Sequence, residues 1–381
     1  MNIHKLIGVK MPEAVNDNTK IPYDLSVEVP VFDINTDVSD IIQKVLKFGA
    51  VIVNKNDKFF GIVDKKSIKR VELNIPKNET LERFVVKVPK INSRNDVGLV
   101  ATYFYRNHVI ALPYENEGKI DHILDRKTFF KILLSLQDLK NADIKKIMSS
   151  PLTLIDSDSN LSKLKETLDN NNIDTVGVLY NSKFYGIITT DTVLENIVTK
   201  ERSPGIEDEK YSPSNIIIKD YTNTNPITIS EDKPLYEAVD LMVVHDNSPI
   251  VVTKENEPDE PVGLITSTDI LEYITSVNKH STARVFVSGL DKSSYIYEDE
   301  IKEDIKNFLC KINKITDIGV DYISVSIKKI KTSQYNVRFR LITDKYGAIQ
   351  VNYSDYLLDR TIEEGIKKLD TIVMKYKSRE E

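Results

Sequence analysis

One unit occurs four times in the sequence, and this repetition constrains the fold more than any other feature. Each copy begins with a proline that enters a short apolar strand, at Pro30, Pro89, Pro151 and Pro226. A helical segment, two strands joined by a polar turn, and a second helix follow in every copy. The pattern therefore predicts four successive β-α-β-β-α units.

The last helix of each unit begins with a fixed pattern, which is clearest in the fourth copy. Gly263-Leu264-Ile265 is typical of the end of a buried strand, Thr266 of a helix N-cap, and Asp269 of the third helical residue. One interpretation is a capping box, in which Thr266 and Asp269 satisfy each other's backbone N–H groups and only start the helix. The other interpretation is a binding site.

The four units resemble the CBS domain family, whose nucleotide-binding signature is a glycine, two apolar residues, Thr or Ser, two further residues and Asp. CBS repeats pair into modules, and many members hold adenine nucleotides in the clefts. The resemblance implies AMP, ADP or ATP as a regulatory ligand, with Asp269 on the ribose hydroxyls and Thr266 near the phosphate, where a helix N-terminus favours an anion. It also implies that four further residues line this cleft: Thr228, Ser248, Pro249 and Ile250.

The copies differ at the two positions that separate capping from ligand binding. All four keep a capping residue, which is Asp64, Asp125, Thr189 and Thr266 in turn. Three residues later, the copies carry Ser67, Thr128, Thr192 and Asp269 in turn. Only the fourth copy matches the nucleotide signature fully, and the acidic caps of the first two stand where a phosphate would approach. A nucleotide is therefore expected in the fourth copy and not in the first two.

Composition limits the other functions. The chain has 381 residues, 40% of them hydrophobic and 29% charged, which is ordinary for a soluble protein with two or three cores. The net charge of −6 requires that any nucleic-acid contact come from a local basic surface. The one cysteine, Cys310, excludes an intrachain disulfide and is expected on the buried stripe of a helix.

Several classes of protein are not expected. The beginning of the chain has no signal-peptide pattern and no run approaches the ~20 apolar residues of a membrane span, so we expect a cytoplasmic protein without membrane contact. The five histidines are scattered, and neither a phosphate loop nor a dinucleotide glycine fingerprint is present. We therefore expect no catalytic residues, no metal ligands, no required cofactor and no enzyme activity.

The pattern changes after the fourth unit. A strand is predicted at 284–290, a helix through 301–312, and three strands at 322–330, 336–342 and 348–351. A closing helix is predicted to start near Ser354 or Asp355. The predicted order is β-α-β-β-β-α, which makes the whole chain an α+β protein.

This order, with a closing helix that ends in lysines, is similar to the ribosome hibernation-promoting factor domain. In that family two helices pack on one face of a four-stranded sheet, and basic residues engage small-subunit ribosomal RNA. As a whole, the chain resembles archaeal proteins that join CBS repeats to ribosome hibernation. The resemblance implies the ribosome as partner.

The residues of this segment give their own support for RNA contact. The strand pair from 326 to 340 is basic and has no acid, whereas the helices mix both signs, which is also typical of a solvated face. Because Val337, Phe339 and Leu341 must face the helices, alternation predicts Arg338 and Arg340 on the open face. The candidate RNA-binding residues are Lys328, Lys329, Lys331, Arg338, Arg340, Lys367, Lys368 and Lys375.

The sequence thus predicts an arm at 1–24, a degenerate CBS pair at 25–139, a second CBS pair at 142–277 and an RNA-binding domain at 282–381. The favoured hypothesis is a hibernation factor that silences translation. Its last domain occupies the small subunit, and its CBS modules add a ribosome contact, a homodimer interface or an adenine-nucleotide sensor. The alternative is a nucleotide-sensing CBS regulator of a metabolic enzyme or transporter.

Overall fold

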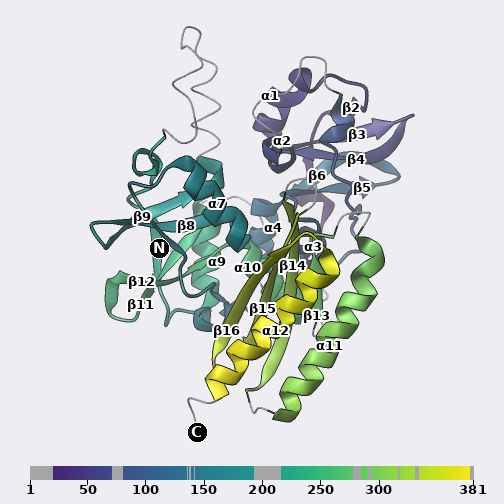
Figure 1. Cartoon of the computed structure of the whole chain (residues 1–381). Helices are drawn as coiled ribbons and strands as arrows, with labels where there is room; N and C mark the ends of the chain where they lie inside the picture. The colour runs from purple at the N-terminus through teal and green to yellow at the C-terminus, as the bar shows by residue number, and fades with distance from the viewer. Residues whose placement is uncertain are drawn as a thin grey trace. The chain divides into compact units, whose positions relative to one another are not determined.

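The computed structural model describes residues 20–70, 80–134, 136, 139–140, 142–192, 216–277, 285–290, 294–315, 318–330 and 334–377 (Figure 1). These residues form two compact units. The first comprises the chain up to Phe104, Val109–Asp143 and Pro234–Asn247, and the second comprises Tyr105–His108, Ile144–Lys233 and Ser248–Glu381. The predicted arm up to residue 19 lies outside the described residues, as do residues 278–281 between the second predicted CBS pair and the predicted RNA-binding domain.

The first unit contains two repeats and one helix of the fourth repeat. Its strands are β1 (Val27–Glu28), β2 (Val31–Asp33), β3 (Ala50–Lys55), β4 (Lys58–Asp64), β5 (Ala111–Asn116) and β6 (Lys119–Asp125). Its helices are α1 (Val38–Phe48), α2 (Lys65–Arg70), α3 (Val97–Asn107, which continues into the second unit), α4 (Arg126–Leu133) and α9 (Leu235–Val244), with short 3-10 turns at Tyr23–Leu25 and Leu81–Arg83.

The second unit contains the third repeat, the rest of the fourth repeat and the C-terminal domain. Its repeat strands are β7 (Leu154–Asp156), β8 (Thr175–Tyr180), β9 (Lys183–Thr189), β10 (Ile227–Ser230), β11 (Ile250–Lys254) and β12 (Glu257–Ile265). The helices of these repeats are α6 (Ile144–Ile147), α7 (Leu161–Asn171) and α10 (Ser267–Val277), with a 3-10 turn at Ile218–Tyr221.

The strands of each repeat confirm the predicted topology. In the first, third and fourth repeats the first strand pairs in parallel with the second, and the second pairs antiparallel with the third. In the second repeat the first strand is reduced to one parallel bridge between Ile91 and Tyr114, followed by the antiparallel pair β5 and β6. Apolar side chains of the strands and helices form the repeat cores, as in the cluster around Val176, Val178 and Leu164.

The two repeats of each pair exchange backbone hydrogen bonds reciprocally. The segment that enters one repeat pairs with the last strand of the other, as Val27 with Ile123, Ile62 with Val86, Ser149 with Leu264, and Ile187 with Asn223. This pairing explains the glycines before the helix caps. A Cβ at Gly61 would lie 2.6 Å from the Val86 carbonyl oxygen, and one at Gly263 would lie 2.9 Å from that of Ser149. The signature glycine is therefore a requirement of close backbone approach.

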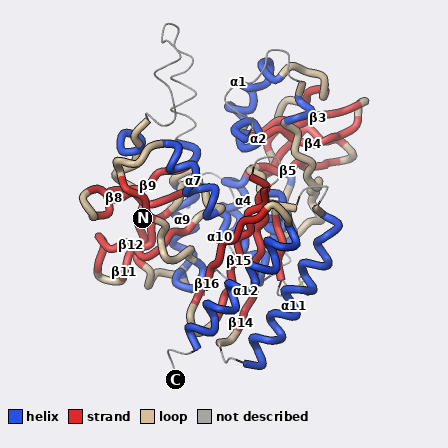
Figure 2. The backbone as a smooth tube through the Cα atoms, in the orientation of Figure 1, coloured by secondary structure: helices blue, strands red, loops and turns tan. Residues whose placement is uncertain are grey.

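The C-terminal domain has a four-stranded sheet in the order β13-β14-β15-β16. Its strands are β13 (Val285–Ser288), β14 (Val320–Ile330), β15 (Gln334–Thr343) and β16 (Gly347–Asp355). The first pair is parallel and the others are antiparallel. Both helices, α11 (Glu298–Ile315) and α12 (Leu358–Lys377), lie on the same side of the sheet (Figure 2). The predicted element order is confirmed.

One boundary in this domain was predicted wrongly. The closing helix begins at Leu358, not near Ser354 or Asp355, because those residues still belong to β16 and pair with Asn336 and Tyr335. The Asp355 carboxylate accepts the N–H of Tyr356 at 2.6 Å, so it stabilises the turn that precedes the helix.

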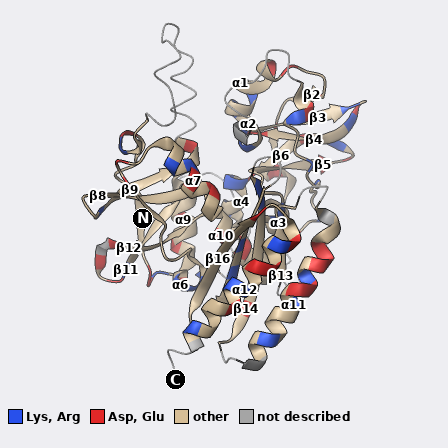
Figure 3. Cartoon of the chain, viewed as in Figure 1, with Lys and Arg blue, Asp and Glu red and all other residues tan. Residues whose placement is uncertain are grey.

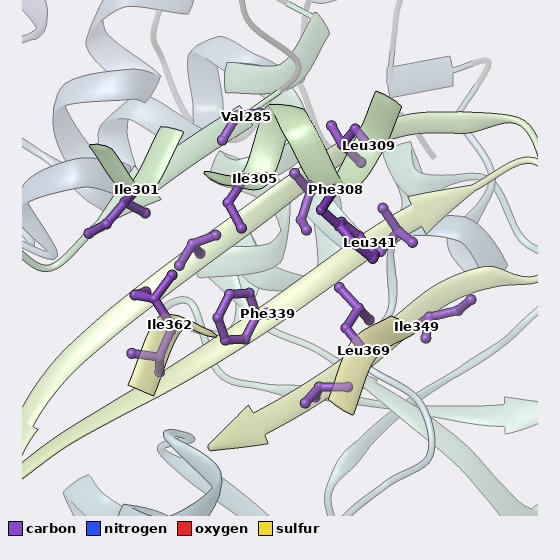
Figure 4. Close-up of a cluster of buried hydrophobic side chains, with 14 of the residues drawn as sticks. Val285, Ile301, Ile305, Phe308, Leu309, Phe339, Leu341, Ile349, Ile362 and Leu369 are labelled. Atoms are coloured by element: carbon purple, nitrogen blue, oxygen red, sulfur yellow. The ribbon is translucent and has the colours of Figure 1, made fainter. Parts of the chain in front are cut away.

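The helix-facing side of the sheet is an apolar core. Phe339 and Leu341 of β15 point toward Ile305 and Phe308 of α11 and toward Ile362 of α12 (Figure 4). Gly365 of α12 allows the closest approach, since a Cβ there would clash with the Phe339 ring. The packing of these side chains holds the two helices on the sheet.

Candidate functional site

All four repeats cap their last helix with the predicted residue. The Asp64 carboxylate accepts the Ser67 N–H at 2.7 Å, and the Asp125 carboxylate accepts the Thr128 N–H at 2.8 Å. In the third repeat the Thr189 hydroxyl accepts the Thr192 N–H at 3.1 Å. Residues 193–215 lie outside the described residues. In the second repeat the Thr128 hydroxyl also donates to Asp125, so the capping pair closes on itself, whereas in the first repeat Asp64 Oδ2 also accepts the Ile110 N–H at 3.2 Å.

The fourth repeat forms the same box with a carboxylate at the third position. Asp269 Oδ2 accepts the Thr266 N–H at 2.8 Å and the Thr266 hydroxyl at 2.6 Å. The capping interpretation is therefore correct, as far as this one carboxylate oxygen is concerned. The box leaves Oδ1 of Asp269 for other partners.

Oδ1 of Asp269 binds two side chains that no capping role requires. It accepts the Ser149 hydroxyl at 2.9 Å and lies 3.2 Å from Nη1 of Arg340, which belongs to β15 of the C-terminal domain. The two charged side chains are 4% and 1% exposed, so this is a buried ion pair. Asp269, which was predicted to bind the ribose, and Arg340, which was predicted to bind RNA, thus bind each other.

Arg340 reaches a second acid on the same helix. Its Nη1 donates to Glu272 Oε1 at 2.9 Å, and its Nη2 donates to the carbonyl oxygens of Ile147 and, at 3.3 Å, of Met148. Burial by itself lowers the pKa of Arg340, but Glu272 and Asp269 outweigh it and hold the pKa above its ordinary value. The guanidinium is therefore charged, and both of its terminal nitrogens donate to acceptors from the third and fourth repeats.

Arg338, two residues earlier, joins the same cluster. Its Nη2 donates to the Ser149 hydroxyl at 2.8 Å and to Gln350 Oε1 at 2.8 Å. Burial lowers the pKa of Arg338, and no carboxylate pairs with it directly among the contacts of the described residues. Ser149 bridges Asp269 and Arg338, so both arginines are bound to one short segment of the repeats.

Other bonds extend this contact along the sheet. The Asn336 amide donates to the Asn170 carbonyl oxygen at 3.0 Å, and the Asn172 amide donates to the Ser326 carbonyl oxygen at 3.2 Å. Lys328 pairs with Asp169 at 3.0 Å. Helices α6 and α7 of the third repeat thus cover the face of the sheet that lies opposite α11 and α12.

The other predicted cleft residues lie on the strands next to Thr266. Ile250 pairs with both Ile227 and Ile265, so the turn with Ser248 and Pro249 meets the end of β12. Thr228 is exposed on β10. The strand register brings these residues to one sheet, as predicted; their contact with a nucleotide remains a prediction.

The predicted RNA-binding residues fall into three groups. Arg338 and Arg340 lie opposite the helix face, as alternation predicts, but the prediction of an open face is wrong because the repeats cover it. Lys328 lies on the same face as the arginines. Lys331 lies outside the described residues. The exposed lysines are Lys329, Lys367, Lys368 and Lys375.

The charges on the two helices are mixed (Figure 3). Lys367 lies 2.8 Å from both Glu363 and Glu364, and these hydrogen bonds raise its pKa. Lys368 donates to the Asn352 carbonyl oxygen at 3.1 Å. Cys310 is exposed, so the expectation that it belongs to the core is wrong.

Neither a metal site nor a membrane-spanning helix is seen in the described part of the chain. Among these residues no group of His, Cys, Asp or Glu has the arrangement of a metal site. Within the same residues, no helix combines the length and apolar character needed to cross a membrane.

The comparisons with known proteins agree with the repeat topology. The sequence model of the CBS domain matches residues 23–74, 144–199 and 218–276, which are the first, third and fourth repeats. The second repeat, whose first strand is reduced, falls outside these matches. A search of curated proteins finds no match to this chain.

Solved structures of low sequence identity are similar to parts of this chain. Protein MJ1225 of Methanocaldococcus jannaschii, described as a candidate archaeal homolog of g-AMPK, is 16% identical with a TM-score of 0.51, covering 66% of this chain and 98% of its own. A conserved protein of Pyrococcus horikoshii is 14% identical with a TM-score of 0.46, covering 66% and 97%. The CBS pair of protein MJ0100, solved with 5'-methylthioadenosine and S-adenosyl-L-methionine, is 22% identical with a TM-score of 0.29, covering 35% and 94%.

Proposed function

Since the chain is a protein with multiple CBS domains, we propose that it is a regulatory ribosome-binding factor that silences translation through its C-terminal domain. The observation that carries the proposal is the architecture of that domain. Two helices pack on one face of a four-stranded sheet in the order β-α-β-β-β-α, the arrangement expected of a hibernation-promoting factor. The small-subunit RNA is the proposed partner.

The charges of the domain support contact with phosphates. Lys367, Lys368 and Lys375 are exposed on α12, whereas Arg338 and Arg340 share one face of β15 that the repeats cover. Phosphate contacts by such side chains release counterions, so binding should weaken steeply with salt and depend little on base identity. No catalytic role is proposed for any residue; the chain is proposed to act by binding.

Cosedimentation with purified small subunits across a salt series, without nucleotide and with saturating ATP or AMP, tests this proposal. In at least one of these conditions the full chain should sediment with the subunits at low salt and dissociate as salt rises, and a chain that ends at residue 281 should stay in the supernatant. An isosteric control replaces Glu363 and Glu364, the acidic partners of Lys367, with Gln; it removes two negative charges and should preserve or strengthen binding. Failure of the full chain to sediment at any salt concentration would exclude the ribosome as partner.

A second function, adenine-nucleotide sensing, is favoured by the fourth repeat. CBS domains typically bind adenine nucleotides, and only this repeat combines a hydroxyl cap with a carboxylate whose second oxygen extends beyond the capping box. AMP, ADP or ATP is the proposed ligand, with Asp269 on the ribose and Thr266 near the phosphate. If the protein senses adenine nucleotide but does not bind ribosomes, it would instead be a regulator of a metabolic enzyme or transporter.

Calorimetry with AMP, ADP and ATP tests the second function. Asp269→Ala should abolish binding, whereas Thr192→Asp, which rebuilds the signature in the third repeat, should not lower the affinity of the fourth. Equal binding by wild type and Asp269→Ala would leave Asp269 with only its capping and ion-pair roles.

A further inference from the structure

We infer that the contact of Arg340 with Asp269 and Glu272 is an intramolecular latch, in which adenine nucleotide and the C-terminal sheet compete for the Asp269 carboxylate. Nucleotide bound at the fourth repeat releases the sheet face that carries Arg338 and Arg340, and RNA can then bind it. The inference rests on the proposed function for the identity of both ligands. The competition itself rests on the geometry of one carboxylate.

Both oxygens of the Asp269 carboxylate already accept hydrogen bonds. Oδ2 is held by the capping box, and Oδ1 is held by Ser149 and Arg340. A ribose that donates its hydroxyls to this carboxylate needs the lone pairs of Oδ1, because the box must persist for the helix to start. The ribose therefore displaces the Arg340 guanidinium.

The second step concerns the arginine face. RNA phosphates and protein carboxylates are bound by the same planar guanidinium donors. Asp269 and Glu272 supply Arg340 with the negative charges that phosphates would supply. While they do so, Arg340 is 1% exposed and no polyanion can reach it. The repeats thus occupy the site that the proposed RNA partner would use.

The third step concerns how easily the contact opens. The covered face is mostly polar, with Ile342 and Phe286 as apolar members, in contrast to the apolar side that holds the helices. Five of its buried polar atoms have no hydrogen-bond partner among the described residues: Tyr322 Oη, Asn336 Oδ1, Arg338 Nε, Arg340 Nε and Asn352 Oδ1. Buried polar groups without partners oppose burial, so water favours separation of this face. The contact is built to be reversible.

Calorimetric titration of the full chain with ATP and with AMP tests the competition. Arg340→Met removes the competing cation and should lower the Kd for nucleotide at least fivefold. Glu272→Gln keeps the shape of the cluster, leaves Asp269 in place and should lower the Kd in the same direction. The matched control is Lys328→Met, which removes a cation from the same face but one that pairs with Asp169; its Kd should stay within twofold of wild type.

Opening can be observed with fluorescent labels in the same protein. Cys310 is exposed on α11 and can carry a donor, and Glu255→Cys on the exposed turn between β11 and β12 can carry an acceptor. Saturating ATP or AMP should lower the transfer efficiency in wild type. Glu272→Gln should start from a lower efficiency and change less when nucleotide is added.

The outcomes separate the latch from the proposed function. Equal nucleotide affinities in wild type, Arg340→Met and Glu272→Gln overturn the latch, even if nucleotide sensing stands. Absence of nucleotide binding in all three proteins also overturns it. Tighter nucleotide binding in both latch variants, together with absence of cosedimentation with small subunits, supports the latch and removes only the ribosome from the proposed function.

Discussion

The two faces of the C-terminal sheet are built from alternate residues of the same strands, yet they are held in different ways. Toward α11 and α12, β15 presents Val337, Phe339 and Leu341, all fully buried in an apolar core. Toward the repeats it presents Asn336, Arg338 and Arg340, which are held by hydrogen bonds and an ion pair. One strand therefore takes part in two interfaces of opposite chemistry.

The helix-facing contact of the sheet is permanent, whereas the repeat-facing contact can open. Apolar burial contributes ~25 cal/mol per Å² and needs no specific geometry, so the helix face stabilises the domain itself. A buried ion pair recovers its desolvation cost only if every donor is satisfied, so it adds little net stability while strongly selecting its partner. The polar face is therefore suited to exchange one anionic partner for another.

Loss of the Phe339 ring from the apolar face should lower the free energy of unfolding more than any other change considered below. Phe339→Ala should lower the free energy of unfolding of the C-terminal domain by about 3–5 kcal/mol, because it removes a fully buried ring that contacts Gly365 of α12. Denaturant unfolding followed by tyrosine fluorescence measures it. Ile349→Val is the conservative control and should cost about 0.5–1.5 kcal/mol. A loss no greater than that of the control would mean that this face does not dominate stability.

Breaking the ion pair on the polar face should have the second-largest effect on the free energy of unfolding. Arg340→Met leaves two buried carboxylates without their cation and should destabilise the second unit by about 3 kcal/mol, measured by the same unfolding experiment. The triple variant that adds Asp269→Asn and Glu272→Gln should regain most of this loss, because no charge then remains unpaired. If the triple variant is no more stable than Arg340→Met, the cost arises from lost packing and not from the carboxylates.

A smaller effect isolates the capping role of the fourth repeat from its role at the polar face. Thr266→Ala removes the hydroxyl that binds Asp269 and should cost about 1 kcal/mol in thermal unfolding. Thr189→Ala in the third repeat, whose cap contacts no arginine, should cost about the same. A much larger loss for Thr266→Ala would indicate that the cap also positions Asp269 for Arg340.

The smallest effect is expected at the rim of the polar face. Lys328 and Asp169 pair at 3.0 Å, but their side chains are 39% and 27% exposed, so Lys328→Met should cost only about 0.5 kcal/mol. The unfolding free energy at low and high salt measures this. A loss as large as that of Arg340→Met would contradict the distinction between the rim and the centre of this face.

The sequence predicts much of this organisation because local patterns determine it. Alternation along β15 correctly places Val337, Phe339 and Leu341 against the helices and the two arginines on the other side. The cap residues of all four repeats are also predicted correctly, because capping involves only residues three apart.

The partner of the arginine face could not be predicted in the same way. Alternation tells which side chains share a face, but not which part of the chain covers it. Arg340 and Asp269 lie in separate predicted domains, and each has a credible external ligand. Their pairing depends on α6 and on Ser149, which precede the first strand of the third repeat and carry no motif. The role of Ser149 as a bridge was missed for this reason.

The reciprocal strand pairing within each repeat pair has a consequence for synthesis of the chain. Ser150 binds the carbonyl oxygen of Val262, 112 residues later, and Tyr23 binds His122, 99 residues later. The first segment of a module therefore has no partner until nearly the whole module has left the ribosome. Contacts between such distant residues slow folding, because a long loop must close before any of them forms. A module that emerges at ~5–20 residues per second spends several seconds with the segment that enters its first repeat unpaired.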